Sequence, residues 1–390
     1  MRILFVSLFL PQAKAYHAGG RFVFEIIRHL SEKHEIHLVT RLEENELPTL
    51  EDLKPFCKKI YPYTYRTVRK RGILDAAALV LNYTGFSRYA NRLAQSGLYD
   101  VVQVEWTEAA LLMKKGNTPM VLDAHDVISK PAERRAARSR GLKRIFHRFL
   151  FLLIKNREVS IVKRFERVFT HSDYDRKYLQ SLAPKVRAEV IPHPAGLDIT
   201  DRKLGREKNT ILFLASYKYR RVNVDAALYF YHKVFPLVRR EVPDATFIIA
   251  GYGPPAELTS LAEKDPAVMV RGFVEDIDEC YKTAAVFVAP ILIGGGIIVK
   301  VLDAFAAGTP VVTTSYGNEG IGAEPGRDLL VADDPESFSG AVVRLLTDDR
   351  FAGEIAENAR AFAQKNFGLS TVMQKIESTY NEIVRRKTIN

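Results

Sequence analysis

The segment from Pro290 to Thr314, PILIGGGIIVKVLDAFAAGTPVVTT, is the feature that most constrains the fold. The apolar run VFVAP leads into it, three glycines follow, apolar residues then recur at helical spacing, and the apolar run PVVTT ends it. This order predicts a strand, a glycine loop, a helix and a second strand. A strand–helix–strand unit of this kind belongs to a parallel sheet that helices cover on its faces.

The glycines of this segment, Gly294, Gly295 and Gly296, stand directly before the predicted helix. Glycine adopts positive φ without steric cost, so the loop N–H groups and those of the first helical turn can converge on a phosphate. Lys300 and Asp303 are three residues apart and share a helix face. An amine for a diphosphate and a carboxylate for a diol suit a nucleotide. The alternative is a glycine-rich turn before a half-buried helix that carries an ordinary solvated ion pair.

Apolar runs and helical patterns alternate along the rest of the chain, and the alternation restarts after a polar, proline-bearing stretch. The expected strands are RILFVSLF, EIHLVT, DVVQVE, PMVLDAH, RVFTHS and AEVIPH, and then TILFLAS, DATFIIAG, AVMVRG, VFVAP, PVVTT and DLLVAD. This pattern predicts an α/β protein with two doubly wound, Rossmann-like parallel-sheet domains. We place the first domain over 1–192, a linker over 193–208, the second domain over 209–369, and a terminal helix over 370–390 that returns to the first domain.

These motifs, in this order, resemble the retaining glycosyltransferases of family 4 (group 1, glycogen-synthase-like), in the branch associated with bacterial surface polysaccharides. The resemblance rests on GGGIIVKVLDAFAAGTPVV with the following GNEGI, and on ASYKYRRVNVDAALYF, IIAGYGPPAEL and VRGFVEDIDECY. It implies a GT-B architecture, in which an acceptor-binding domain and a nucleotide-sugar-binding domain face each other across a cleft. Asp303 stands where the family usually has glutamate, Gly295 where it often has an acid, and Ile298 where this branch often has arginine.

The resemblance also assigns roles to individual residues. His125 and Asp126 match the acceptor-domain positions near the transferred sugar, although His125 could also be a satisfied core or helix-capping histidine. The residues expected to bind the donor are Gly19, Gly20, Gly272, Phe273, Gly294, Gly295, Gly296, Lys300 and Asp303, with Arg220 and Arg221 as further diphosphate contacts. Asn223 is expected to cap a helix. Glu105, at the end of DVVQVE, faces the same crevice without an assigned role.

Two other patterns suggest different chemistry. Gly251 to Ala256 fits the dinucleotide fingerprint G-x-G-x-x-A, but it follows the second strand of its domain and not the first, which argues against a dehydrogenase. The acidic pairs Asp173/Asp175 and Asp276/Asp278 have metal-binding spacing, but each begins a predicted helix, where acids cap free N–H groups. We therefore expect neither a metal ion nor another cofactor.

Positive charge is concentrated in the first half of the chain. Residues 1–195 hold 34 Lys and Arg against 20 Asp and Glu, whereas the remainder holds 23 against 26. The basic residues of 130–167 are interleaved with Phe, Leu and Ile, as in segments that lie on anionic membranes. The same pattern is also typical of a helix with one face buried and the other solvated.

Two further features bear on where the chain works. The N-terminal run ILFVSLFL imitates a short signal peptide, but its length and the helical pattern behind it favour a first strand. Two widely separated cysteines, Cys57 and Cys280, indicate a reducing compartment without a disulfide framework.

The resemblance, together with these features, implies a retaining, metal-independent hexosyltransferase-type enzyme (EC 2.4). It would move a sugar from a nucleotide-sugar to a glycan or lipid-linked acceptor in polysaccharide or glycolipid biosynthesis. We expect it in the cytoplasm, peripheral at the inner face of the plasma membrane. The alternatives are a GT-B-fold epimerase or phosphorylase and, outside enzymes, a basic nucleic-acid-binding protein. Beyond charge, the sequence has no nucleic-acid-binding feature, so we expect no nucleic-acid partner.

Overall fold

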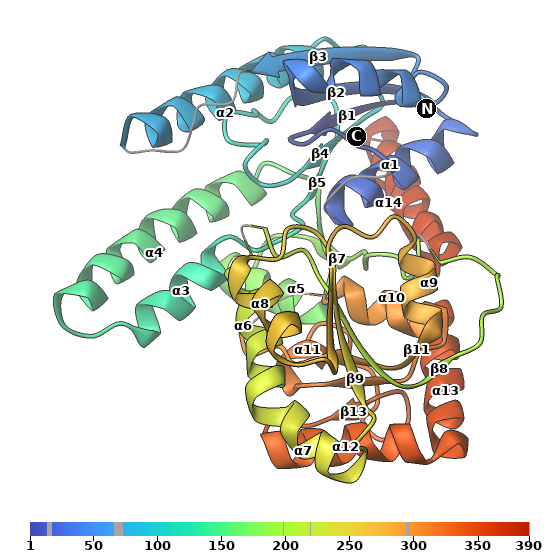
Figure 1. The fold of residues 1–390 in the computed structure, drawn as a ribbon. Coiled ribbons are helices and arrows are strands. Elements are labelled where there is room, and N and C mark those ends of the chain that lie inside the picture. The colour runs from blue at the N-terminus through green and yellow to red at the C-terminus, as the bar shows by residue number, and fades with distance from the viewer. Residues whose placement is uncertain (14–17, 66–72, 198, 219, 294–296, 390) are drawn as a thin grey trace. The chain divides into compact units, whose positions relative to one another are not determined.

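A computed structural model shows the chain as two compact units, each built on one parallel sheet (Figure 1). It describes residues 1–13, 18–65, 73–197, 199–218, 220–293 and 297–389. Unit 1 contains Met1–Pro192 and Met373–Asn390, and unit 2 contains His193–Val372. The two units are described separately below.

Unit 1 has a seven-stranded sheet in the order β3-β2-β1-β4-β5-β6-β7, with every neighbouring pair parallel. The strands are β1 Arg2–Ser7, β2 Glu35–Glu43, β3 Lys59–Tyr65, β4 Val101–Glu105, β5 Met120–Asp123, β6 Arg167–Thr170 and β7 Ala188–Val190. The helices are α1 Ala18–Ser31, η1 Glu44–Leu53, α2 Ile73–Ala94, α3 Ser129–Arg138, α4 Gly141–Val162 and α5 Asp173–Leu182, joined by the later part of α14 Leu369–Ile389.

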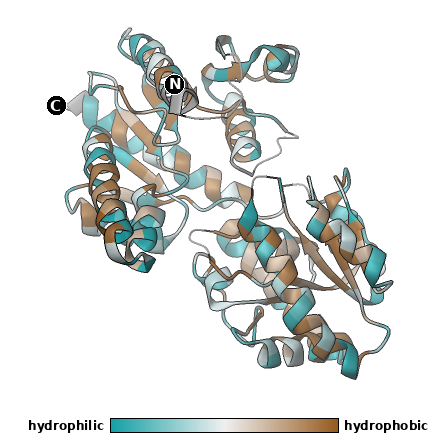
Figure 2. Ribbon diagram, turned by 60° about the vertical axis from the view of Figure 1, so that its left-hand side comes forward, coloured by the Kyte–Doolittle hydropathy of each residue, from teal (hydrophilic) through white to brown (hydrophobic). Residues whose placement is uncertain are grey.

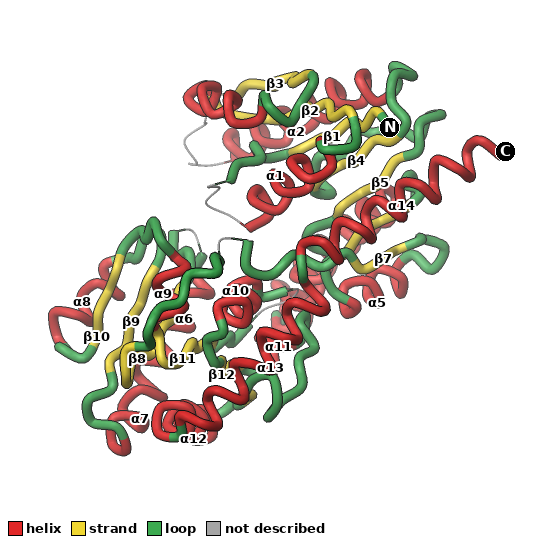
Figure 3. Tube along the Cα trace, turned by 90° about the vertical axis from the view of Figure 1, so that its right-hand side faces the viewer, coloured by secondary structure: helices red, strands yellow, loops and turns green. Residues whose placement is uncertain are grey.

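Unit 2 has a six-stranded parallel sheet in the order β10-β9-β8-β11-β12-β13. The strands are β8 Glu207–Leu214, β9 Thr246–Ala250, β10 Val268–Arg271, β11 Ala284–Ala289, β12 Val311–Thr313 and β13 Leu330–Val331. The helices are α6 Arg221–Tyr229, η2 Phe230–Val234, α7 Phe235–Glu241, α8 Ala256–Lys264, α9 Ile277–Thr283, α10 Val299–Ala307, α11 Ser315–Asn318, α12 Pro335–Thr347 and α13 Asp349–Phe367. Figure 3 shows helices and strands alternating along both units.

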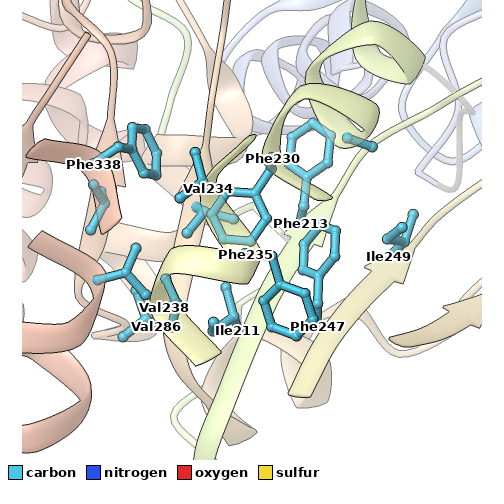
Figure 4. Close-up of a cluster of buried hydrophobic side chains, with 14 of the residues drawn as sticks. Ile211, Phe213, Phe230, Val234, Phe235, Val238, Phe247, Ile249, Val286 and Phe338 are labelled. Carbon is cyan, nitrogen blue, oxygen red and sulfur yellow. The ribbon is translucent and has the colours of Figure 1, made fainter. Parts of the chain in front are cut away.

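The strands of unit 2 are apolar on both faces, because successive side chains of a strand point to opposite sides. On β8, Ile211 and Phe213 join one buried cluster with helices α6, α7 and α12, whereas Leu212 joins a second with α9, α10 and α13. Figure 4 shows the first cluster, in which Phe230 and Phe235 lie close to Phe213 and Phe247. The strands are accordingly among the most hydrophobic parts of the chain in Figure 2. The doubly wound prediction is therefore confirmed.

The structure departs from the sequence expectations in three places. The strand β3, KIYPYTY, was not predicted, since it carries Pro62 and is only half buried; an edge strand tolerates proline because one side of its ladder is unpaired. Residues 193–206, expected to be part of a linker, belong to unit 2, whose first strand begins at Glu207. Asn223 does not cap its helix, because the N-cap of α6 is Arg220.

The final helix, α14, belongs to unit 1 from Met373 onward. Arg167 on β6 pairs with Glu382 at 2.6 Å, and Thr379 donates to Glu189 on β7 at 2.7 Å. The terminal helix is thus tied to the sheet by polar contacts as well as by buried residues such as Ile376 and Tyr380.

The N-terminal apolar run forms β1, which pairs with β2 and β4 near the centre of the sheet. Both cysteines are buried and free. Among the helices of the described residues, none has the length and apolarity that a membrane crossing requires.

Candidate active site

Lys300, in the first turn of α10, is the first predicted donor residue that the structure places in a defined environment. Its Nζ donates to Asn223 Oδ1 at 2.9 Å and lies 4.9 Å from the centre of the Phe213 ring. Asn223 Nδ2 donates in turn to the Ser216 carbonyl at 2.7 Å, which orients the amide with its oxygen toward the amine. We refer to Lys300, Asn223, Arg220 and Phe213 as the Lys300 group.

None of the other members of the Lys300 group has a carboxylate that could pair with the Lys300 amine. Burial and, to a smaller extent, the positive charge of Arg220 lower the pKa of Lys300 to about 7. An amine in this state gains most from a ligand that brings negative charge. The second candidate arginine, Arg221, points elsewhere, because its guanidinium pairs with Asp225 at 2.7 Å and with Glu257. The structure thus places Arg220, and not Arg221, beside Lys300.

Asp303, one turn further along α10, is 7 % exposed. Its Oδ1 accepts the backbone N–H of Gly196 at 3.1 Å. Gly196 has φ of 63°, and a Cβ there would collide with Ala306 of the same helix. Asp303 therefore holds the start of unit 2 against α10, a contact that sequence reasoning did not anticipate. The glycines 294–296 lie outside the described residues.

Gly272 and Phe273 follow β10 at the carboxyl edge of the sheet. The Gly251 N–H reaches the Gly272 carbonyl at 3.1 Å, and the exposed Phe273 ring meets Tyr252 edge-on, with centroids 6.4 Å apart. Gly251 has φ of 129°, and a Cβ there would strike the carbonyl of Ala215. Packing against the end of β8 therefore explains the first glycine of the dinucleotide-like fingerprint.

The second set of predicted residues lies in unit 1, at the carboxyl ends of β4 and β5. The imidazole of His125 stacks on Trp106 with ring centroids 4.2 Å apart and planes 9° apart. Both residues have positive φ, 39° and 70°, which is rare for bulky side chains and occurs where surrounding structure imposes it. A Cβ at Gly19 would lie 2.9 Å from the Trp106 ring and 3.3 Å from His125 Nδ1, so glycine lets α1 begin against this stack.

Three buried side chains surround the His125 ring. Glu105 Oε2 lies 2.8 Å from His125 Nε2, His171 Nε2 lies 3.3 Å from His125 Nδ1, and Asp123 Oδ1 lies 3.4 Å from His171 Nε2. Burial raises the pKa of Glu105 to about 7 and raises that of Asp123 as well. We refer to Glu105, Trp106, Asp123, His125 and His171 as the His125 cluster.

Most of this cluster was not predicted from the sequence. His171 follows β6 as Trp106 follows β4, so a signal existed: polar or aromatic residues at the carboxyl ends of three successive strands. The strand order β4-β5-β6 then brings those ends together. Asp126, the second predicted catalytic residue, has an exposed side chain.

The acidic pairs have local partners. Asp276 caps α9 by accepting the Glu279 N–H at 3.0 Å, and Asp278 pairs with Lys282 at 2.8 Å. In the other pair Asp175 binds the buried Lys130 at 2.8 Å, and Ser172, not an acid, is the N-cap of α5. Ligand atoms of Asp123, His125 and His171 lie within 4.8 Å of one another, which is close enough to share a metal ion. Metal-independent transfer therefore stays a prediction.

Two family models match the chain and together cover most of it. The model described as "Glycosyltransferase Family 4" matches residues 19–198, and the model described as "Glycosyl transferases group 1" matches residues 208–348. The chain belongs to the family 4, group 1 glycosyltransferases. It is a glycosyltransferase (EC 2.4) of GT-B fold that uses a nucleotide-sugar.

Individual relatives of this glycosyltransferase cover all or part of it. A 44.6 kDa protein in the cps region of Klebsiella pneumoniae is 26 % identical and covers 96 % of this chain and 98 % of its own length. The phosphatidyl-myo-inositol mannosyltransferase of Mycolicibacterium smegmatis is 31 % identical over 43 % of this chain and 46 % of its own. Among solved structures, Anabaena HepE in complex with UDP-glucose has a TM-score of 0.68 at 15 % identity, covering 98 % of this chain and all of that one.

Proposed function

We propose that this glycosyltransferase is retaining and metal-independent, and that it transfers a sugar from a nucleotide-sugar to a glycan or lipid-linked acceptor in polysaccharide or glycolipid biosynthesis. The observation that carries the proposal is the Lys300 group. A buried amine held by the neutral oxygen of Asn223 and lying beside Arg220 is a site that gains a counter-charge when a diphosphate binds.

Lys300 would act on the leaving group. As the glycosidic bond to the diphosphate breaks, negative charge grows on the phosphate oxygen, and a positioned amine stabilises that charge more in the transition state than in the ground state. Lys300 takes a proton when the diphosphate arrives and supplies the charge that a metal ion supplies in other enzymes. In a retaining transfer the acceptor would attack from the face that the diphosphate leaves, with His125 near the transferred sugar.

The relatives support the assignment of substrates. The Klebsiella relative lies in a cps region, the Mycolicibacterium relative acts on a phosphatidyl-myo-inositol, and HepE binds UDP-glucose. A UDP-sugar and a lipid-linked or polysaccharide acceptor are therefore the first substrates to try.

The test begins with the wild-type protein and a panel of nucleoside diphosphates. A diphosphate that binds the folded state raises the melting temperature as its concentration rises. Sugar transfer from the matching nucleotide-sugar is then measured with excess chelator. The expected result is undiminished transfer with retention of anomeric configuration. Activity that chelation abolishes and Mn²⁺ restores would rule out metal independence, and release of an epimerised or phosphorolysed sugar in place of transfer would favour the alternative enzyme classes.

We also propose that unit 1 contacts an anionic membrane, at the inner face of the plasma membrane, through α4. Six apolar side chains of α4 are exposed and lie on one face of the helix, so they form one stripe: Leu142, Ile145, Phe146, Phe149, Leu152 and Leu153. Exposed basic residues flank the stripe, among them Lys143, Arg144 and Arg148. An apolar stripe bordered by cations fits a lipid surface that carries negative charge.

The C-terminal end of α4 is anchored by hydrogen bonds, which hold the helix that carries the apolar stripe. Glu158, near the end of α4, accepts from the Ile128 N–H at 2.8 Å and from the Ser129 N–H at 3.2 Å. In Figure 1 α3 and α4 form a helical pair, and Leu142, close to the turn between them, is 85 % exposed.

Flotation with vesicles tests this contact. We expect binding to vesicles that contain phosphatidylglycerol, weakening as salt rises because the charges are screened. Leu142→Ser with Ile145→Ser should reduce it, whereas a matched pair at exposed leucines elsewhere in unit 1, Leu81→Ser with Leu98→Ser, should not. Equal binding to neutral and anionic vesicles would contradict the electrostatic part of the proposal.

A further inference from the structure

We propose that Glu105 is the positioning residue for His125. Gln103 and Tyr380 connect Glu105 to the C-terminal helix by hydrogen bonds. The inference deepens the proposed function and rests on it in one respect, since it assumes that His125 contacts the substrate. The geometry of the cluster is independent of that assumption.

A chain of hydrogen bonds begins at α14 and ends at the imidazole. The Tyr380 hydroxyl donates to Gln103 Oε1, Gln103 Nε2 donates to Glu105 Oε1 at 2.7 Å, and Glu105 Oε2 lies 2.8 Å from His125 Nε2. All of these side chains are buried, and Glu105 is 0 % exposed. Each oxygen of the carboxyl group thus has a partner, which leaves the group one orientation.

The other ring nitrogen of His125 meets a histidine whose own orientation is set by the backbone. His171 Nδ1 lies 2.8 Å from the Ile191 carbonyl, and a carbonyl only accepts, so Nδ1 carries a proton. His171 Nε2 then faces His125 Nδ1 at 3.3 Å. The backbone thus fixes His171, and His171 fixes the Nδ1 side of the His125 ring. Glu105 then determines the ring angle and the proton position on the Nε2 side.

The ring faces are constrained as well. Trp106 stacks on one face at 4.2 Å, and Phe22 approaches edge-on with its centroid 6.3 Å away. Among the described residues, the charged or titratable groups around His125 include Glu105 from β4, Asp123 from β5 and His171 after β6, with Tyr380 of α14 behind Glu105. Edge and face contacts together leave the imidazole a single position.

A structural role alone does not account for Glu105. It ends the strand VVQVE, whose residues are all buried, and a buried carboxyl group costs free energy that an apolar side chain of similar size avoids. The residue directly after it has strained backbone, as does His125. Backbone strain and a buried carboxyl group occur together where the protein fixes a functional side chain in position.

The test uses Glu105→Gln, which keeps the shape of the side chain and removes its charge. We expect kcat/KM for sugar transfer to fall about tenfold to a hundredfold, as for loss of a charge-assisted hydrogen bond. Binding of the nucleoside diphosphate should stay within about twofold, because only the His125 contact is lost. Tyr380→Phe removes one hydroxyl at the far end of the chain and should give a smaller fall in the same direction, even if the glutamine variant folds poorly.

Trp106 supplies a second readout, since it is the only tryptophan of the protein. We expect the stacked imidazole to quench the indole, so the emission should rise when Glu105 no longer holds the ring. Glu158→Gln is the matched control for the emission: it changes another buried carboxyl group of unit 1 in the same way, but that group bonds Ser129 and Ile128, so the emission of Trp106 should stay unchanged.

A double variant separates positioning from an independent role. If Glu105 acts through His125, then His125→Ala with Glu105→Gln should be no slower than His125→Ala alone. Additive losses, or unchanged Trp106 emission in Glu105→Gln, would overturn the proposal. So would a transition metal bound in stoichiometric amount, because the cluster would then be a metal centre. If the wild type transfers no sugar from any donor, the proposed function fails, and the emission of Glu105→Gln, Tyr380→Phe and Glu158→Gln still decides whether Glu105 holds the ring.

Discussion

The His125 cluster of unit 1 and the Lys300 group of unit 2 both bury titratable side chains, but different groups surround those side chains. His125 lies between Glu105 and His171, and these two side chains contact its two ring nitrogens. Lys300 lies beside the neutral amide of Asn223 and the positive charge of Arg220. The first arrangement holds a side chain in place within the protein. In the second, no carboxylate of the described residues pairs with the amine, which is what a binding site for an anion needs.

The largest effect that would separate the two regions is expected from Lys300→Ala. Turnover should fall about tenfold to a hundredfold, and more than the apparent donor constant rises, because the amine acts most on charge that develops during bond breaking. Steady-state kinetics with the identified donor measures both. Lys233→Ala, at an exposed lysine of the same unit, is the control and should behave like the wild type. Unchanged kinetics in Lys300→Ala would mean that the diphosphate binds elsewhere.

Asp303 gives a smaller effect that distinguishes ribose binding from packing. Asp303→Ala should weaken donor binding about tenfold with little change in turnover, as for a contact of equal strength in ground and transition states. Asp303→Asn keeps an oxygen that can accept the Gly196 N–H, so it should restore stability but not the full donor affinity. Full recovery of both in the asparagine variant would assign Asp303 to packing alone.

Replacing Lys300 should stabilise the protein, whereas replacing His125 should destabilise it. The pKa of Lys300 is lowered to about 7 in the folded protein, so between pH 7 and its ordinary value the unfolded chain binds more protons and stability rises with pH. Lys300→Met removes the penalty of the buried charge. Its gain in stability should be largest at pH 7 and below, and should shrink by about 1.4 kcal/mol per pH unit above pH 7.

His125→Ala should act in the other direction. It leaves the buried Glu105 without its 2.8 Å partner, at a cost of about 1–3 kcal/mol. Denaturant unfolding of both variants at pH 6, 7, 8 and 9 gives the comparison. If both substitutions destabilise by the same amount at every pH, the contrast drawn between the two regions is wrong.

The smallest expected effect is the uptake of a proton when a diphosphate binds. At pH 8 Lys300 should be largely neutral in the free protein, and a bound diphosphate should restore its charge, so binding takes up at most about one proton. Calorimetry of diphosphate binding in buffers with different ionisation heats measures this number. The uptake should vanish in Lys300→Ala and persist in Glu105→Gln, whereas a loss in the second variant alone would place the titrating group in unit 1.

The sequence by itself determined the fold class and the family. Two series of apolar runs separated by helical patterns dictate two parallel sheets, because strands buried on both faces must be apolar throughout. Local spacing also placed Lys300 and Asp303 on one face of α10. It missed β3, whose proline and half-polar pattern are those of an edge, and it assigned Asn223 to a cap that the structure places at Arg220.

Only the tertiary structure decided what the site residues touch. Gln103, Glu105, His125, His171 and Tyr380 are spread over most of the chain, and the order of strands in the sheet and the return of α14 bring them together. Asn223 meets Lys300, and Gly196 meets Asp303, for the same reason. Local patterns report hydrophobic period and backbone preference, which act over a few residues, whereas hydrogen bonds between distant residues depend on how the elements pack.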